Sequence, residues 1–398
     1  MDKVMAVSST TRRQTSGYSS RMLATLSLGT AALIAGQIAI SPLLPTVIDE
    51  FSISSTEAGA ALTLMWFVAA LAMYPGGHLS DHLSRRVVLV AAVALSSVGF
   101  AILALSPYFF TFAVGLTVLG LGIGLFEPTS LATVSDLFAD ARGRAFGIIS
   151  SSFNVGYASA SALALGGLAV GSWRLSFLPA IAFLLVSGLL FHVWADGTYA
   201  VTRVKMRPVA ALRRVIKTPQ LRLLLVVLCL HMFIMQGAVS FVPTMLQIEQ
   251  GFTSTGAALA FTSIFLVGLV SNPIAGVLGD RVGHTQVGLV LPIIGATGLS
   301  VSLLAPTPAV TVGGLLLFAV GLLAFWPVIT AELTSGMALE TVGGDYGITR
   351  TVFFGFGSLG PTYVGFVGDR ASFTLAYAGL VGCFLLIAGL VYRIHRLP

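Results

Sequence analysis

One carboxylate stands out as a group that could carry a proton. Glu127 lies in a long apolar run that contains no other charge, and Pro128 follows it directly. If this run spans a bilayer, the carboxylate is costly there, and ionisable residues in such positions are by default functional. Burial disfavours the charged form, so Glu127 is a candidate proton carrier. The alternative is a carboxylate near enough to a helix end to be hydrated.

Two further charged residues, Arg350 and Glu332, could act with Glu127 if the chain moves a solute, here called the cargo, across a bilayer together with protons. Arg350 could pair with a carboxylate or bind an anionic cargo through two guanidinium nitrogens. The candidate carboxylates are Glu127, Glu332 and Asp345. Arg350 could equally be a helix-end arginine whose charge reaches the bilayer surface. Glu332 is expected near the inner end of its helix, where water is available.

Polar and aromatic residues inside apolar runs could line a substrate cavity. Gln37 and Gln236 occupy equivalent positions in the two halves of the chain, which suits a pseudo-symmetric cavity. Amides in such positions can also join neighbouring helices. The other candidates could pack as readily as they contact a cargo: Trp66, Asn154, Tyr157, His231, Asn272 and Trp326. Of these, His231 could titrate near neutral pH.

A short charged loop lies between two apolar runs and returns in the second half. Its carboxylate is favoured near a helix N-terminus by the helix dipole, and its arginines can form charge-assisted hydrogen bonds. Contacts of this kind across the two halves would latch one side of the protein in one state and break in the other. The alternative is an interfacial loop whose arginines only fix topology. The residues of the two copies are Gly77, Asp81, Arg85, Arg86, Asp280 and Arg281.

The composition is that of a membrane protein. Charged residues form 9% of the 398 residues and hydrophobic residues 56%, whereas ordinary soluble domains have about 25% charged residues. Apolar runs long enough to cross a bilayer recur along the chain. The sequence therefore predicts an all-α integral membrane protein with twelve transmembrane helices, at roughly 22–44, 56–76, 87–105, 109–131, 145–169, 174–194, 221–243, 256–276, 285–305, 311–333, 347–367 and 373–392.

An internal repeat relates the two sets of six helices. Gln37 matches Gln236, Asp81 matches Asp280, and Phe126 matches Phe325, at offsets of 199 residues. Because both halves begin on the same side, they are parallel repeats around a central cavity, which suits alternating access. The expected parts are an N-terminal segment (1–21), a six-helix bundle (22–194), a basic linker (195–220), a second bundle (221–392) and a tail (393–398).

The basic residues indicate the orientation of the chain. With the N-terminus inside, 19 Lys and Arg residues fall on the inner side and 2 on the outer side. Positively charged loops are retained in the cytoplasm, so we expect both termini to be cytoplasmic in a plasma-membrane protein. This placement argues against nucleic acid as the reason for the net charge of +6. The two cysteines lie in apolar runs and indicate neither a disulfide nor a metal site.

The loop after the second expected span is similar to the signature of the major facilitator superfamily, Gly-x-Leu-x-Asp-Arg-x-Gly-Arg-Arg. The matching residues are Gly77, Leu79, Asp81, Arg85 and Arg86, while His82 and Ser84 depart from the signature. The resemblance covers almost the whole chain and implies a transporter that moves small molecules by alternating access. The arginine and the Gly-Pro motif that many proton-linked exporters of this family carry in spans four and five are absent, which weakens the drug-antiporter interpretation.

We therefore expect a secondary transporter, coupled to protons, that exports amphipathic compounds. The main alternative is an uptake symporter for a small organic anion, which Arg350 and the missing span-five motif favour. A membrane-embedded receptor or enzyme on the same scaffold is the rival from another class, although no metalloprotease or phosphate-binding motif supports an enzyme. The expected partners are a small molecule, protons and the lipid bilayer, without a cofactor or nucleic acid, and the expected state is a monomer.

Removing the charge of Asp81 tests the latch hypothesis. Asp81→Asn deletes a latch charge without altering helix hydrophobicity, so it should change the conformational cycle and leave membrane insertion intact. The measurement is labelling of cavity cysteines from the two sides of the membrane. A labelling ratio equal to that of the unmodified protein would contradict the latch.

Overall fold

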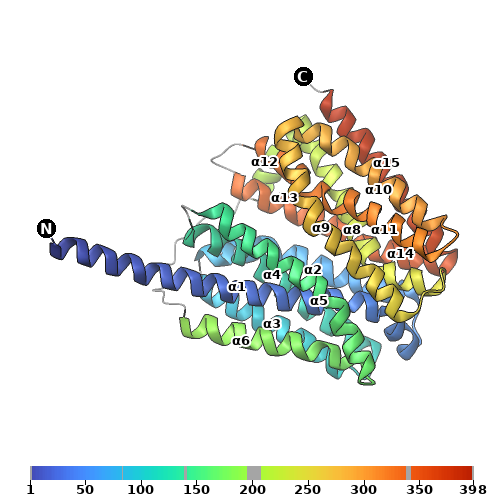
Figure 1. The fold of residues 1–398 in the computed structure, drawn as a ribbon, viewed down its shortest axis with the longest axis horizontal. Coiled ribbons are helices and arrows are strands. Elements are labelled where there is room, and N and C mark those ends of the chain that lie inside the picture. The colour runs from blue at the N-terminus through green and yellow to red at the C-terminus, as the bar shows by residue number, and fades with distance from the viewer. Residues whose placement is uncertain (1, 83, 139–140, 195–207, 338–341, 397–398) are drawn as a thin grey trace.

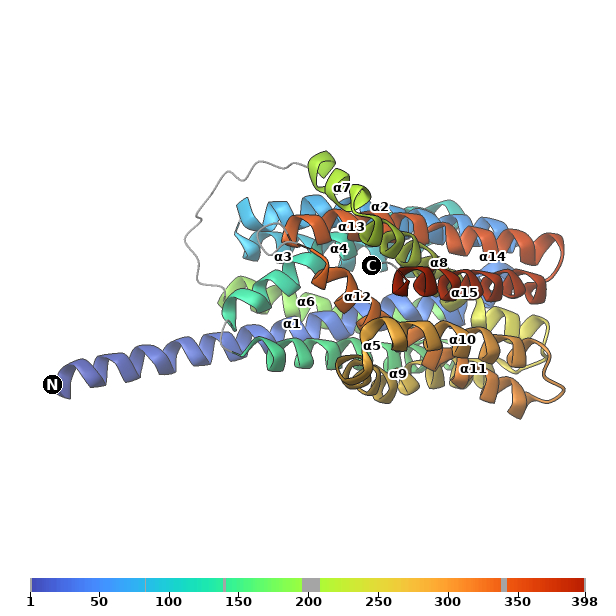
Figure 2. The same cartoon turned by 90° about the horizontal axis from the view of Figure 1, so that it is seen from above.

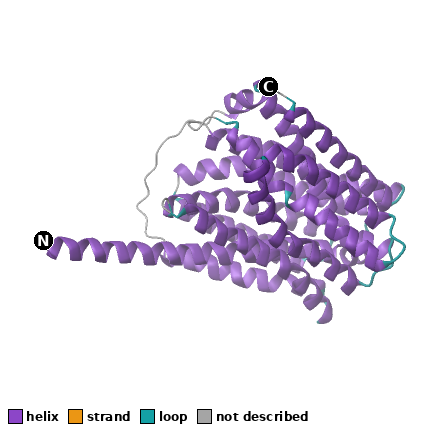
Figure 3. Cartoon of the chain, turned by 45° about the horizontal axis from the view of Figure 1, so that its top comes forward, coloured by secondary structure: helices purple, strands orange, loops and turns teal. Residues whose placement is uncertain are grey.

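The computed structural model describes residues 2–82, 84–138, 141–194, 208–337 and 342–396, and their side chains except those of 2–16, 81–82, 142 and 342–344. Over this part of the chain every regular element is a helix, and most short connections lie at the two ends of the bundle (Figure 3). The elements are α1 (Asp2–Phe51), α2 (Ser55–His82), α3 (Arg85–Leu105), α4 (Phe109–Leu137), α5 (Arg142–Ala169), η1 (Trp173–Phe177), α6 (Leu178–Trp194), α7 (Pro208–Lys217), α8 (Pro219–Ile248), α9 (Ser254–Val282), α10 (His284–Leu303), α11 (Pro308–Leu323), α12 (Phe325–Ser335), α13 (Val342–Gly357), α14 (Leu359–Arg370) and α15 (Phe373–His395).

Eleven helical segments of the described chain are long and apolar enough to span a membrane. They include the expected runs except 347–367, which the structure divides into α13 and α14. The division falls at Ser358 because Pro361 has no N–H to donate to the carbonyl of Gly357. Together α13 and α14 supply the twelfth crossing. The all-helical membrane fold predicted from the sequence is confirmed.

Glycines on α4 allow two neighbouring helices to approach its backbone. A Cβ atom added at Gly120 or Gly124 would collide with backbone atoms of α2, and one at Gly122 would lie 2.7 Å from the backbone nitrogen of Ser96 on α3. Without a hydrophobic force between helices in lipid, such close van der Waals packing is a main source of association. This packing holds α4, and the carboxylate that it carries, firmly against α2 and α3.

The helices form two groups, which Figure 1 shows in blue to green and in yellow to red. Helices α1 to α6 pack mainly on one another, and α8 to α15 do the same. The groups meet where α2 packs against α13 and α14, where α5 packs against α9, and where α1 packs against α8. Figure 2 shows α1 extending beyond both groups at its N-terminal end. We call the bundle end at which α1 finishes the Phe51 end, and the opposite end, where α3 begins, the Ser84 end.

The repeat is visible in the contacts of two carboxylates at the Phe51 end. Glu50 accepts a hydrogen bond from the indole of Trp173 and pairs with Arg174 at 2.6 Å. Glu249 accepts from the backbone N–H of Phe373 and from the backbone and hydroxyl of Thr374. In both groups the carboxylate joins the end of the first helix to the start of the sixth, over sequence separations of 123 to 125 residues.

At the Phe51 end the two groups are joined by hydrogen bonds. Asp369 of α14 accepts from the backbone N–H groups of Ser55 and Thr56 at 3.0 and 2.6 Å, and so caps the N-terminus of α2. The hydroxyl of Thr63 donates to the carbonyl of Ser358 at 2.6 Å and accepts from the N–H of Thr362 at 3.2 Å. A side chain of one group therefore bonds to the backbone at the start of α14 in the other group.

Contacts between the groups are looser toward the Ser84 end. A Cβ atom at Gly59 or Gly365, near the Phe51 end, would lie within 3.0 Å of backbone atoms of the opposite group. At Gly347 the nearest atom, from Tyr74, would be 4.0 Å away, and at Gly276 no atom would lie within 4 Å. The structure is therefore closed at the Phe51 end.

Part of the expected linker is a helix attached to the second group. Ala211 and Val215 of α7 are buried, and Arg214 pairs with the buried carboxylate of Asp345 at 2.6 Å. This hydrogen bond raises the pKa of Arg214. Arg213 and Lys217 also lie in α7, whereas residues 195–207, which contain Arg203, Lys205 and Arg207, lie outside the described chain.

Replacing Asp369 tests whether its cap holds the Phe51 end closed. Asp369→Asn leaves only one acceptor oxygen for the two N–H groups of α2, so the closed state should lose about 1 kcal/mol. A cysteine placed at Ser55, which is buried next to Gly365 of α14 in this state, should then react severalfold faster with a membrane-impermeant maleimide. Asp49→Asn, an exposed carboxylate at the same end, is the matched control. Equal reactivity in the two variants would contradict the role of the cap.

Candidate functional site

The centre of the candidate site is an ion pair between the two groups of helices. Arg350 of α13 donates through Nη2 to Glu127 Oε1 of α4. Their side chains are only 10% and 20% exposed. Both lie within membrane-spanning segments, so each charge depends on the other for its main compensation. The structure brings together two of the residues that the sequence analysis named for coupling.

Aromatic side chains surround this pair. The Arg350 guanidinium carbon lies 5.2 Å from the centre of the Phe354 ring, a cation–π contact. Tyr346 is close enough to interact electrostatically with both charges, and Tyr157 with Glu127. The Nε atom of Arg350 is buried and has no hydrogen-bond partner among the described residues. One donor of the guanidinium is therefore available.

A row of rings extends from the pair across the two groups, and we call it the aromatic wall. It consists of Trp66, Phe354, Phe353, Trp326 and His231. Successive ring centres are 6.2, 5.4, 5.8 and 6.1 Å apart in that order, which is the usual range for aromatic pairs. The first ring belongs to α2 and the others to the second group. Three predicted cavity residues thus take part in one contiguous row of rings.

Several buried polar atoms lack partners among the described residues. They include both amide atoms of Gln37 and of Gln236, the Nδ1 atom of His231 and the Oδ1 atom of Asn272. Gln37 and Gln236 are 4% and 3% exposed at equivalent positions of α1 and α8, helices that contact each other. An unsatisfied buried polar group is costly, so these atoms require water or a ligand. This agrees with, but does not test, their expected role in a cavity.

The other carboxylates named as possible partners of Arg350 are engaged elsewhere. Glu332 of α12 accepts a hydrogen bond from the amide of Gln220 at 3.1 Å, while Asp345 pairs with Arg214 of α7. Of the three carboxylates that the sequence offered as partners for Arg350, the structure selects Glu127.

The predicted latch residues contact their own group in this state. Arg85 pairs with Asp136 at 2.7 Å, at the ends of α3 and α4, and Arg86 donates to the carbonyl oxygen of His192 on α6. In the second copy, His284 lies 3.7 Å from Asp280, and Arg281 is exposed. Gly77 lies in α2 near the Ser84 end, and the side chain of Asp81 is outside the described part of the chain. The latch between groups remains a hypothesis.

Residues that the sequence analysis did not select complete the site. Phe265 stacks on Tyr157 with ring centres 4.3 Å apart and planes 2° from parallel, joining α5 to α9. Asn154 lies one turn before Tyr157 on α5 and is partly buried. Phe353, Phe354 and Phe265 were missed because apolar rings in apolar helices carry no charge or polarity to mark them. The only signal was the spacing of Phe354 one turn after Arg350.

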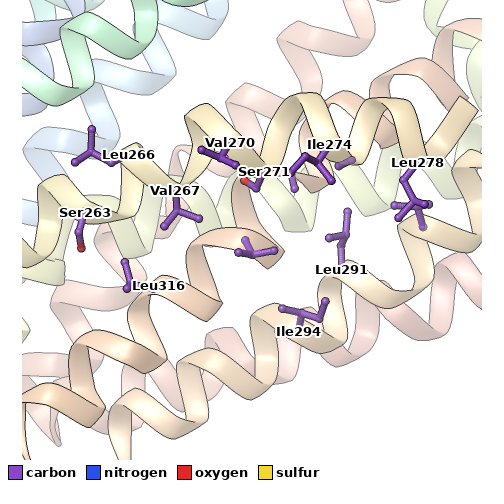
Figure 4. A pocket seen from close by; sticks show the side chains of 14 residues that line it. Ser263, Leu266, Val267, Val270, Ser271, Ile274, Leu278, Leu291, Ile294 and Leu316 are labelled. Atoms are coloured by element: carbon purple, nitrogen blue, oxygen red, sulfur yellow. The ribbon is translucent and has the colours of Figure 1, made fainter.

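A separate, open apolar pocket of about 700 Å³ lies at the surface of the second group, between α9, α10 and α11 (Figure 4). Its lining is aliphatic except for Ser263 and Ser271. It contains neither charge of the ion pair and no ring of the aromatic wall. Among the described residues no cluster of three His, Cys, Asp or Glu side chains is placed to hold a metal ion.

Comparison with known proteins agrees with this architecture. The uncharacterized MFS-type transporter YwfA of Bacillus subtilis (strain 168) is 26% identical over 404 residues, which cover 93% of this chain and 90% of that protein. A class G tetracycline resistance protein of Vibrio anguillarum is 30% identical over 179 residues, which cover 44% of this chain and 43% of that protein.

A solved structure shares the fold over nearly the whole chain. It is a bacterial homolog of the human lysosomal transporter Spinster, in an inward-facing and unoccupied conformation, with a TM-score of 0.80 and 16% identity. The alignment covers 95% of this chain and 97% of that one. The family model of the Major Facilitator Superfamily matches residues 26–361. Since that match takes in most of the twelve crossings, both helix groups and the ion pair between them, the chain belongs to the Major Facilitator Superfamily of transporters.

Proposed function

We propose that this protein is a proton-coupled symporter that takes up a small organic anion through the plasma membrane. The observation that carries the proposal is the ion pair of Glu127 and Arg350, which joins the two helix groups inside the membrane-spanning region. Glu127 is the proton acceptor in this proposal, and Arg350 is the cation that a proton on Glu127 releases for the cargo.

The charges of the site in its four loading states favour symport. When the site is empty, Glu127 and Arg350 neutralise each other. With a proton alone, Arg350 stays charged and unpaired; with an anion alone, the site has a net negative charge. Only the empty site and the site that holds both proton and anion are neutral. Because an unbalanced charge inside a bilayer is costly, these two states change conformation most readily, which couples the two solutes.

The same reasoning disfavours exchange of a proton for a cationic compound. An antiporter must change conformation with either solute bound, and here each loaded state has an extra positive charge while the empty site is neutral. The empty site would then cross freely and dissipate the gradient. Export remains the second candidate, because a relative that matches less than half of this chain is named a tetracycline resistance protein. The geometry of the pair therefore moves our preference from export to uptake.

The proposed cycle uses the two helix groups as moving bodies. We place the Ser84 end in the cytoplasm, on the basis of the 19 to 2 distribution of basic residues. The closed Phe51 end then faces outward, and the structure represents an inward-facing state. Residues 22–194 and 221–392 are the proposed bodies, and α7 moves with the second because Arg214 is bound to Asp345. Rocking of one body against the other would expose the pair to each side in turn.

Glu127→Gln tests proton coupling. Glutamine keeps the shape of the side chain and imitates the protonated acid, so the variant should bind cargo but be unable to load or release a proton. In liposomes, accumulation driven by a proton gradient should fall by at least tenfold, while counterflow exchange of cargo persists. Glu332→Gln is the matched control, since that carboxylate is engaged with Gln220. Accumulation at the level of the unmodified protein would remove Glu127 from the coupling role.

The stability of variants tests whether the two charges compensate each other. Glu127→Gln leaves an arginine that cannot lose its proton, whereas Arg350→Gln leaves a carboxylate that can become neutral. The first variant should therefore lower the free energy of unfolding more, by up to about 3 kcal/mol. The double variant should recover most of this loss. Thermal unfolding in detergent measures all three, and additive losses in the double variant would contradict the compensation.

A further inference from the structure

We infer that the transported anion is a planar aromatic or conjugated carboxylate, held by its carboxylate on Arg350 and by its ring against the aromatic wall. The inference rests on the proposed function in that it assigns Arg350 to the cargo once Glu127 is protonated. It goes further in naming the chemical class of that cargo.

The free donors of Arg350 fit a carboxylate. A carboxylate binds a guanidinium best through two parallel N–H···O bonds, and Nε and Nη2 form one such edge. In the structure Nη2 donates to Glu127, while the buried Nε has no partner among the described residues. Protonation of Glu127 weakens its hold on Nη2. The complete edge then becomes available to one incoming carboxylate.

The surroundings of Arg350 favour a flat ring attached to that carboxylate. The guanidinium lies 5.2 Å from the centre of the Phe354 ring, in the aromatic wall. Phe353 and Trp326 continue the wall on one side and Trp66 on the other, with successive ring centres 5.4 to 6.2 Å apart. A ring joined to a carboxylate on Arg350 would meet Trp66 and Trp326, the partly exposed rings of the wall, with a geometry that aromatic pairs prefer.

The end of the wall offers a polar contact for a substituent on the ring. His231 is 2% exposed, and its Nδ1 has no partner among the described residues. It lies against Phe325 and Trp326, with ring centres 5.1 and 6.1 Å away. A buried polar atom without a partner is unfavourable unless water or a ligand satisfies it. A hydroxyl or carbonyl on the cargo would supply such a partner.

The wall also explains which anions would bind weakly. Inorganic anions and short aliphatic acids can occupy the Arg350 edge but leave the rings without a partner. Stacking of one aromatic pair, beyond the area that it buries, corresponds to a preference of about threefold to tenfold. Aromatic cations would gain the stacking but would meet Arg350 with like charge. The site should therefore select for charge first and for planarity second.

The test is equilibrium binding to the full chain in lipid nanodiscs, with tritiated 2-naphthoate as the probe at pH 6 and pH 8. The competitors are decalin-2-carboxylate, which is saturated, 2-naphthamide, which is uncharged, and 2-naphthylmethylamine, which is cationic. We expect naphthoate to bind more tightly at pH 6 than at pH 8. The saturated acid should compete about threefold to tenfold more weakly than unlabelled naphthoate. The amide and the amine should not compete.

Variants assign the binding to the proposed residues. Glu127→Gln should bind naphthoate equally at both pH values. The double variant Glu127→Gln, Arg350→Gln should bind naphthoate at least tenfold more weakly than the unmodified protein. The double variant is used because either single variant would leave one unpaired charge in the site. Trp66→Leu should weaken naphthoate more than it weakens decalin-2-carboxylate. Trp194→Leu is the control, because that indole lies at the end of α6 beside Arg21.

Each failure points to a different step. Equal affinity for the saturated acid, or an unchanged preference in Trp66→Leu, would overturn the aromatic class and leave proton–anion symport intact. Stronger competition by the amine, or retained binding in the double variant, would overturn the assignment of Arg350 to the cargo. If naphthoate binds as expected but Glu127→Gln still accumulates cargo against a gradient, the proposed proton coupling fails while the cargo class stands.

Discussion

The ion pair of Glu127 and Arg350 constrains much of what the two helix groups can do. Neither charge has another charged partner in the described site, and neither is exposed enough to rely on water. Inside a bilayer this dependence is far stronger than at a protein surface. The pair therefore links α4 to α13 in the empty protein. Any movement of one group against the other must first replace one partner by a proton, water or an anion.

The ends of the bundle provide the complementary constraint. At the Phe51 end the contacts between groups involve the backbone itself, through the Asp369 cap and the hydroxyl of Thr63. At the other end the charged loops contact their own groups, as the ion pair of Arg85 and Asp136 illustrates. Strong closure at the Phe51 end and weak contact between the groups at the Ser84 end define one conformational state. The ion pair lies between these ends, where binding of a proton or an anion could change the relative stability of this state and its alternative.

The sequence predicted the helices, the repeat and the residues of the ion pair, because charge inside an apolar run is conspicuous and repeated motifs occur in order. It offered three carboxylates for Arg350, and only the tertiary arrangement, in which Arg350 of α13 reaches Glu127 of α4, distinguishes among them. The aromatic wall could not be predicted, since Phe353 and Phe354 are indistinguishable in sequence from other apolar packing residues. Phe353 and Phe354 become part of the aromatic wall only through tertiary contacts with Trp66 and Trp326, which belong to other helices.

The hydroxyl of Thr63 depends on the backbone at the start of α14 for its hydrogen bonds. It bonds to the carbonyl of Ser358 and to the N–H of Thr362 only while the Phe51 end is closed. Lipid tails offer no substitute, because a buried hydroxyl without a hydrogen-bond partner is costly. Separation of the groups therefore has to be accompanied by hydration. The threonine makes the entry of water, rather than of lipid, a condition for opening.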